Sequence, residues 1–139
     1  MKYALKDSIA YRFIKGANSA SQKLNKNLHP YNIAIEQRAT LEIIKFEPSV
    51  NQTTIAKLLG KDKTTISRSL NSLEKKGLII RKNDINNDKR SNKIILTSQG
   101  EEILEKTFDK VTEFRENLSS KLSKEENEIF FHILNKLEL

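Results

Sequence analysis

The chain has 139 residues, and its 25 lysines and arginines against 18 aspartates and glutamates give a formal net charge of +7 at pH 7. This length allows one domain with its own hydrophobic core, and the excess of positive charge favours an anionic partner. Because the chain has no cysteine, disulfides, cysteine-based zinc sites and thiol redox sensing are excluded. No apolar run is as long as a membrane span or the core of a signal peptide, so we expect a soluble, cytoplasmic protein.

The positive charge is concentrated in the middle of the chain. Residues 1–50 carry 8 basic and 4 acidic side chains, residues 51–93 carry 11 and 4, and residues 94–139 carry 6 and 10. Lysines spread evenly over a solvated surface would not produce this reversal of sign. The middle segment is therefore the expected contact with a polyanion.

The N-terminal segment is predicted to be one long amphipathic helix. Its apolar residues recur about every four positions, the spacing of one helix face: Leu5, Ile9, Phe13, Ala17 and Ala20. Such a face either closes the protein's own core or pairs with a second subunit. Residues 25–32, with Pro30 and several asparagines, are predicted to form a loop.

A second helix is predicted from Ile35 to Phe46, where Glu47 and Pro48 end it. Its inward side chains are expected to be Ala39, Ile43 and Phe46. We expect this helix to support the segment that follows.

Two short helices are predicted after it, from the cap residues and the apolar spacing. Asn51 caps the first, and Gly60 stands where a left-handed turn would end it. Asp62 caps the second. Because about two residues separate Gly60 from the next cap, the helices must cross steeply, as in a helix-turn-helix. The expected buried faces are Ile55, Ala56 and Leu59 in the first helix, and Ile66, Leu70 and Leu73 in the second.

The opposite face of the second short helix carries Thr64, Arg68, Asn71 and Lys75. These side chains supply hydroxyl, guanidinium, amide and ammonium groups but no carboxylate. A face that is merely solvated usually mixes both charge signs, so this one favours a polyanion.

A basic β-hairpin is predicted next. The runs LIIRKN and NKIIL are β-branched and strand-like, and the residues DINNDKRS between them favour a turn. Two strands joined by a polar, basic tip form a wing.

Two more amphipathic helices are predicted after the wing. Thr97 is expected to cap the first, and Ser123 with Glu126 forms a capping box for the second. Together they present more apolar surface than a small domain can cover, so a partner subunit is expected to bury it. The stripe positions are Ile103, Leu104, Phe108, Val111, either Phe114 or Arg115, Leu118 and Leu122 in the first helix, and Ile129, Phe130, Ile133, Leu134 and Leu137 in the second.

Three motifs of the chain are similar to those of one protein family. LEKKGLI covers residues 73–79, Asp88 and Arg90 form a D-x-R in the wing, and residues 96–100 read L-T-x-x-G. In this order they resemble the winged helix-turn-helix core of the MarR family of bacterial transcription regulators, and a looser match extends over nearly the whole chain. The resemblance implies a mainly α fold with a small β-hairpin wing.

The resemblance also implies how the domain is organised. Residues 1–139 would form a single MarR-like domain, with residues 33–97 as its winged helix-turn-helix part and residues 1–30 and 98–139 as helices that interlock in a homodimer. The implied function is that of a sequence-specific regulator of transcription, acting as a repressor on palindromic double-stranded DNA. Members often respond to small anionic or phenolic molecules, but no residue here identifies such an effector.

The recognition helix supplies the first set of predicted DNA contacts, because the N-terminal part of this helix enters the major groove. Arg68 suits a guanine edge, which a guanidinium can bond with two donors. Where members often have arginine and then serine, this chain has Lys63 and Thr64, which leaves the operator sequence open. The predicted contacts are Lys63, Thr64, Thr65, Ser67, Arg68 and Asn71.

The wing supplies the second set. The resemblance implies that Arg90 enters the minor groove and that Asp88 orients it through a charge-assisted hydrogen bond. The other basic residues would contact phosphates, which set affinity and salt sensitivity. The predicted wing residues are Arg81, Lys82, Asp88, Lys89, Arg90 and Lys93.

Other classes of function find less support. No nucleophile with a base and no metal constellation is visible, so neither an enzyme nor a cofactor is expected, and two histidines make a dedicated zinc sensor unexpected. A carboxylate-rich metal site stays open. The alternatives are a non-specific nucleoid-type DNA-binding protein and a winged helix that serves as a protein-interaction module.

Overall fold

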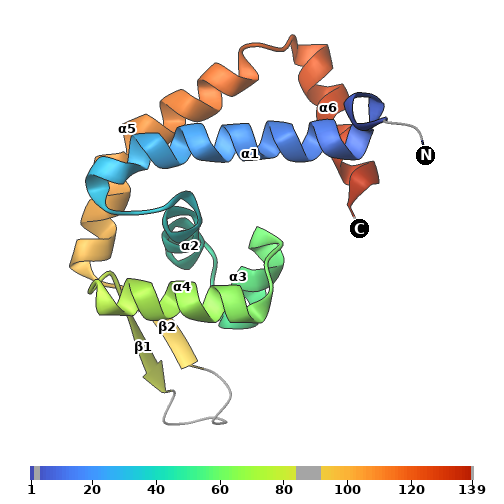
Figure 1. The fold of residues 1–139 in the computed structure, drawn as a ribbon. Coiled ribbons are helices and arrows are strands. Elements are labelled where there is room, and N and C mark those ends of the chain that lie inside the picture. The colour runs from blue at the N-terminus through green and yellow to red at the C-terminus, as the bar shows by residue number, and fades with distance from the viewer. Residues whose placement is uncertain (2–3, 84–91, 139) are drawn as a thin grey trace. The chain divides into compact units, whose positions relative to one another are not determined.

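The computed structural model describes Met1, residues 4–83 and residues 92–138. The described chain is mainly helical with one antiparallel two-stranded hairpin (Figure 1), which confirms the predicted fold class. It divides into two compact units, Met1–Thr107 and Phe108–Leu139. The helices are α1 (Ile9–Leu28), α2 (Ile35–Phe46), α3 (Gln52–Leu59), α4 (Lys63–Lys75), α5 (Ser98–Ser119) and α6 (Lys124–Leu137), and the strands are β1 (Ile79–Asn83) and β2 (Asn92–Leu96).

Helix α1 lies further along the chain than predicted, because it begins at Ile9, after a separate 3-10 turn at Leu5–Asp7. Residues 25–28 were expected in a loop but continue the helix, and a 3-10 turn follows at His29–Tyr31. The physical reason is that Leu24 and Leu28, one turn apart, are both buried, while the Asn25 side chain accepts a hydrogen bond from the Ile35 backbone at 2.7 Å. The N-terminal half of the apolar face has no such cover, since Leu5, Ile9 and Phe13 are exposed.

Helix α2 has the predicted bounds but a different inward face. Its buried residues are Arg38, Thr40, Leu41 and Ile44, whereas Phe46 is 70% exposed. Arg38 can be buried because its Nε donates to Thr107 Oγ1 at 3.0 Å and its Nη1 donates to Glu42. The apolar pattern alone therefore gave the wrong rotation of this helix.

Helices α3 and α4 form the predicted helix-turn-helix. The Asn51 side chain accepts from Thr54 N at 2.9 Å, and Gly60 adopts a left-handed φ of 62°, which is unstrained for glycine. Every predicted inward residue of α4 is fully buried, together with neighbours from α2, α3 and β1. This core consists of Leu41, Ile55, Ile66, Leu70, Leu73 and Ile79.

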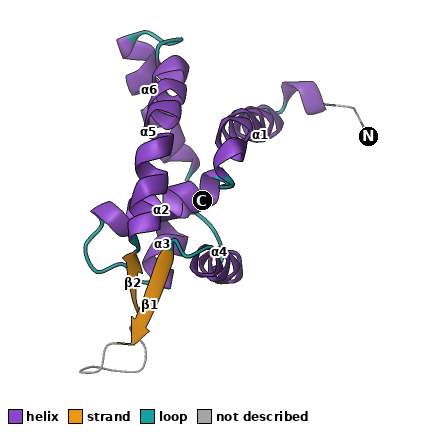
Figure 2. Ribbon diagram, turned by 90° about the vertical axis from the view of Figure 1, so that its left-hand side faces the viewer, coloured by secondary structure: helices purple, strands orange, loops and turns teal. Residues whose placement is uncertain are grey.

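The hairpin pairs β1 with β2 in the register Ile79↔Leu96 to Asn83↔Asn92, and β1 lies beside α4 (Figure 2). The L-T-x-x-G motif fastens its base. Thr97 Oγ1 donates to the Gly77 carbonyl at 2.6 Å and accepts from Gly100 N at 3.1 Å. A Cβ on Gly100 would lie 2.2 Å from the Leu78 carbonyl oxygen, so only glycine allows this approach.

The second unit holds the end of α5 and all of α6. Ser123 and Glu126 form the predicted capping box, with hydrogen bonds of 3.0 and 3.1 Å. No residue of α6 is buried, although its sequence is rich in large apolar side chains. Within the described residues, no helix is long and apolar enough to cross a membrane.

Candidate nucleic-acid interface

The recognition helix α4 begins at a well-made cap. Asp62 Oδ1 accepts from Thr65 N at 2.8 Å, and its Oδ2 accepts from the Thr65 hydroxyl at 2.7 Å. These two bonds lower the pKa of Asp62 below its usual value of 3.8. The carboxylate also stands at the positive end of the helix dipole. The orientation of the first turn of α4 is thus set by a group that stays ionised at neutral pH.

The predicted contact residues of α4 divide by exposure. Thr65 and Ser67 are half-buried, and the Thr65 hydroxyl is already engaged by Asp62. The other predicted residues of this helix are exposed: Lys63, Thr64, Arg68 and Asn71. The exposed set supplies an ammonium, a hydroxyl, a guanidinium and an amide, which are groups that bind phosphates and base edges.

Two contacts that the sequence did not reveal hold the start of α4. Gln52 Nε2, from the first turn of α3, donates to the Lys63 carbonyl at 3.0 Å. Lys61 Nζ lies 3.6 Å from Glu36 Oε1 of α2. Neither contact leaves a local pattern, because both join residues of different elements. They tie the recognition helix to the two helices behind it.

The base of the wing carries a polar cluster. Arg81 of β1 donates through Nε to Glu74 Oε2 at 3.0 Å and through Nη2 to Asn71 Oδ1 at 2.6 Å. The hydrogen bond from Arg81 is the main cause that lowers the pKa of Glu74 below its usual 4.5. The outer face of α4 was expected to lack carboxylates. That holds for its four outer residues but not for its flank, where Glu74 is exposed.

The two strands bring more of the predicted residues together. Lys82 and Lys93 are register partners on β1 and β2, and both are exposed. Two like charges directly opposite each other on paired strands repel. A bound anion would offset this repulsion. Asp88, Lys89 and Arg90 lie outside the described residues.

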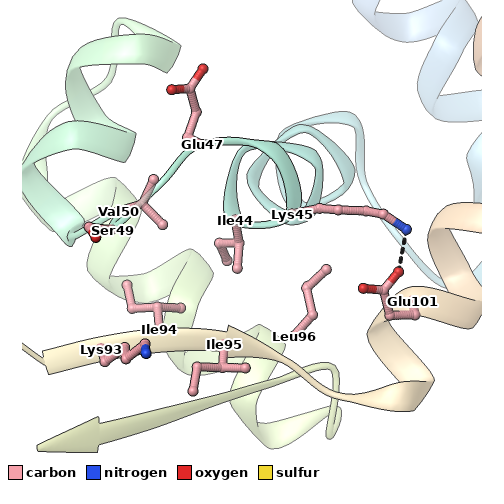
Figure 3. Close-up of a pocket in the computed structure, with 10 residues that line it drawn as sticks. All are labelled: Ile44, Lys45, Glu47, Ser49, Val50, Lys93, Ile94, Ile95, Leu96 and Glu101. Atoms are coloured by element: carbon pink, nitrogen blue, oxygen red, sulfur yellow. Dashed lines mark hydrogen bonds and ion pairs between the residues drawn. The ribbon is translucent and has the colours of Figure 1, made fainter.

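A cavity of about 280 Å³ lies between the end of α2, strand β2 and the first turn of α5 (Figure 3). Its apolar wall includes Ile44 and Ile94, and the ion pair of Lys45 with Glu101 spans one side. Because β2 forms one wall, this space adjoins the wing and the helix core at once.

Comparison with known proteins decides the family. The family model described as MarR family matches residues 33–91. The structure of the S. aureus MepR–DNA complex has 30% sequence identity to the chain, covers 95% of both chains and superposes with a TM-score of 0.84. The chain belongs to the MarR family. A MarR/EmrR family regulator from Acinetobacter sp. ADP1 is 26% identical over 92% of the chain and 90% of its own, with a TM-score of 0.82.

Two relatives named as transcriptional regulators agree with this assignment. The HTH-type transcriptional regulator YwoH of Bacillus subtilis is 25% identical over 90% of each chain. A second HTH-type regulator, BCE33L1758 of Bacillus cereus, is 29% identical over 91% of this chain and 84% of its own. The protein is therefore a MarR family transcriptional regulator, and its winged helix is a DNA-binding fold.

Proposed function

We propose that the protein acts as a cytoplasmic homodimer that binds a palindromic site on double-stranded DNA and represses transcription. The observation that carries this is the outer face of α4, which exposes Lys63, Thr64, Arg68 and Asn71 and itself carries no carboxylate. The structure of the related MepR, which was solved as a DNA complex, supports the same partner.

The docking follows from helix-turn-helix geometry. The N-terminal half of α4 enters the major groove, where Arg68 pairs with a guanine and Lys63 and Thr64 contact bases or phosphates. The exposed Lys82 and Lys93 approach the backbone. Arg90 is proposed for the minor groove, with Asp88 orienting it.

A second copy of the chain is proposed as the cover of the exposed apolar faces. Ile129, Phe130 and Phe131 of α6 are all exposed in the single chain. Charge supports this partner, because α1 carries four basic and no acidic residues, whereas α5 and α6 carry more acidic than basic ones. A dimer thus buries apolar surface and pairs opposite charges at the same time.

The decisive experiment is a titration of DNA from upstream of the protein's own gene, read by fluorescence anisotropy with unrelated DNA as competitor. A palindromic site should retain the bound protein when unrelated DNA is added. Arg68→Ala should relax the preference for particular bases, and Arg90→Ala should weaken binding to all sequences. Equal loss from every sequence would instead indicate the nucleoid-type alternative. Variants as tight as the parent protein would contradict the residue assignments.

We further propose that a small molecule relieves the repression. The cavity beside β2 gives it a physical basis, since a ligand there would touch both the wing and α2. Screening small anionic and phenolic compounds for loss of DNA binding tests it. A set of compounds that leaves the titration unchanged would remove this part and leave DNA binding intact.

A further inference from the structure

The cluster of Arg81, Glu74 and Asn71 lies at the junction between the recognition helix and the wing. Arg81 makes three hydrogen bonds there, two to the carboxylate of Glu74 at 3.0 and 3.3 Å and one to Asn71 at 2.6 Å. The Arg81 side chain is 24% exposed, and that of Glu74 is 42% exposed. An arginine held from two sides in this way has lost most of its rotational freedom before any ligand arrives.

The remaining donors of Arg81 point to a second partner. A guanidinium has five N–H groups, and the three bonds use Nε and Nη2. Within residues 4–83 and 92–138, no group accepts a hydrogen bond from Nη1. Arg81 can therefore stay bound to Glu74 and still donate to an anion.

Position makes a DNA phosphate the fitting anion. The helix α4 and the hairpin are the parts that enter adjacent major and minor grooves, and one phosphodiester strand separates two such grooves. A cation between α4 and β1 consequently faces that strand. Asn71 contributes as well, because its Oδ1 accepts from Arg81 and its amide N–H groups donate to no group in the part of the chain that the structure describes.

We propose that Glu74 is a positioning residue for DNA binding, which holds Arg81 between recognition helix and wing so that Nη1 donates to a backbone phosphate. This inference rests on the proposed function. It makes an unusual prediction of sign. By charge alone, a carboxylate beside DNA repels phosphates, so its removal should tighten binding. If Glu74 instead holds Arg81 in place, removal of its carboxylate should weaken DNA binding.

The test compares Glu74→Gln with Glu47→Gln in the full-length protein, by anisotropy titration with the upstream DNA. Glu47 is a suitable control because it is exposed, belongs to the same unit and forms no ion pair with a described residue. We expect Glu74→Gln to weaken binding about three- to tenfold. Glu47→Gln should leave it unchanged or slightly tighter.

Two further variants separate positioning from mere structure. Arg81→Lys keeps the charge but cannot bond both partners, so it should weaken DNA binding as Glu74→Gln does. The double variant, with Glu74→Gln and Arg81→Lys combined, should bind DNA no more weakly than either single variant. Arg81→Ala removes one phosphate contact from each protomer, so it should reduce the slope of log K against log salt by about 1.8 for the dimer, about 0.9 for each contact. All variants should keep the thermal midpoint of the parent, since exposed ion pairs add little stability.

The outcomes distinguish the two claims. If the parent binds DNA and Glu74→Gln binds as tightly or more tightly, the positioning role is wrong while the proposed function stands. An unchanged salt slope in Arg81→Ala likewise overturns it. If neither the parent nor Glu47→Gln binds duplex DNA, the proposed function fails and the positioning role fails with it.

Discussion

The helices around the winged core and the helix α6 at the C-terminus use the same kind of amphipathic pattern with opposite results. In the core, Ile66, Leu70 and Leu73 recur at helical spacing and each is fully buried. In α6, Phe130, Ile133 and Leu137 also recur three and four residues apart, and each is exposed. Periodicity therefore marks an apolar face but does not say whose surface covers it.

The two regions also differ in the charge they expose. The winged part buries its own apolar core and concentrates positive charge on its surface. This surface is therefore expected to bind an anion. The terminal helices expose apolar faces, and α1 and α5 carry net charges of opposite sign. These helices are therefore expected to bind the matching helices of a second chain. One region is expected to meet DNA and the other to meet a second chain.

The largest effect is expected from a charge placed on the exposed face of α6. Phe130→Glu removes a large apolar side chain and forces a carboxylate into the proposed interface, which should raise the dimer dissociation constant by at least about 1000-fold, or about 4 kcal/mol. Sedimentation equilibrium measures this directly. Operator affinity should fall with it, because a monomer reads only one half-site.

Asn135→Glu is the matched control for this change. It adds the same charge to the same exposed helix, but Asn135 is polar and lies outside the apolar stripe. The control should remain dimeric. A Phe130→Glu protein that sediments like the parent would contradict the proposed role of α6.

A leucine-to-alanine pair probes the two regions with the same chemistry. Leu73→Ala opens a cavity in a fully buried site and should lower the free energy of unfolding by about 2–5 kcal/mol. Leu118→Ala, at a half-exposed position of α5, should act only through the dimer. Urea unfolding at two protein concentrations separates them, since the Leu73→Ala loss should not depend on concentration and the Leu118→Ala loss should. The reverse dependence would contradict the division between core and interface.

Most elements followed from the sequence because their signals are local. Caps such as Asn51, Asp62 and Ser123 act within three residues, and all three bonds are present. The rotation of α2 was wrong because an arginine counts as polar in any pattern, whereas Arg38 is buried by partners far along the chain at Thr107. Long-range partners decide such cases, and periodicity does not contain them.

The candidate site was predictable to the same extent. The exposed face of α4 follows from helix geometry, so Arg68 and Asn71 lie where the sequence placed them. The bond between Arg81 and Glu74 could not be foreseen, because it depends on how the hairpin leaves the turn at Gly77. The seven-residue separation of Glu74 and Arg81 in the sequence does not predict a contact unless the direction of the hairpin is known.

Two glycine-to-alanine substitutions should change the stability of the protein by smaller amounts and in opposite directions. Gly100→Ala would push a methyl group to 2.2 Å from the Leu78 carbonyl oxygen and should destabilise the protein by about 1–3 kcal/mol. Gly16→Ala, in the middle of α1, meets nothing within 4 Å and should stabilise by about 0.5–1 kcal/mol through helix propensity. Chemical denaturation of both variants checks this. A Gly100→Ala protein as stable as the parent would show that the wing base is not clamped at Thr97.

The smallest effect is expected from the pH dependence of the α4 cap. Because the pKa of Asp62 is lowered in the folded state, the folded protein binds fewer protons than the unfolded chain, and stability rises with pH there. The contribution of Asp62 is thus fully present above pH 3.8 and is lost as pH falls through its lower folded value. Asp62→Asn also caps a helix but does not titrate in this range. The difference in thermal midpoint between parent and variant should therefore shrink or change sign in acid, and two parallel curves would show that this carboxylate does not hold the recognition helix through its charge.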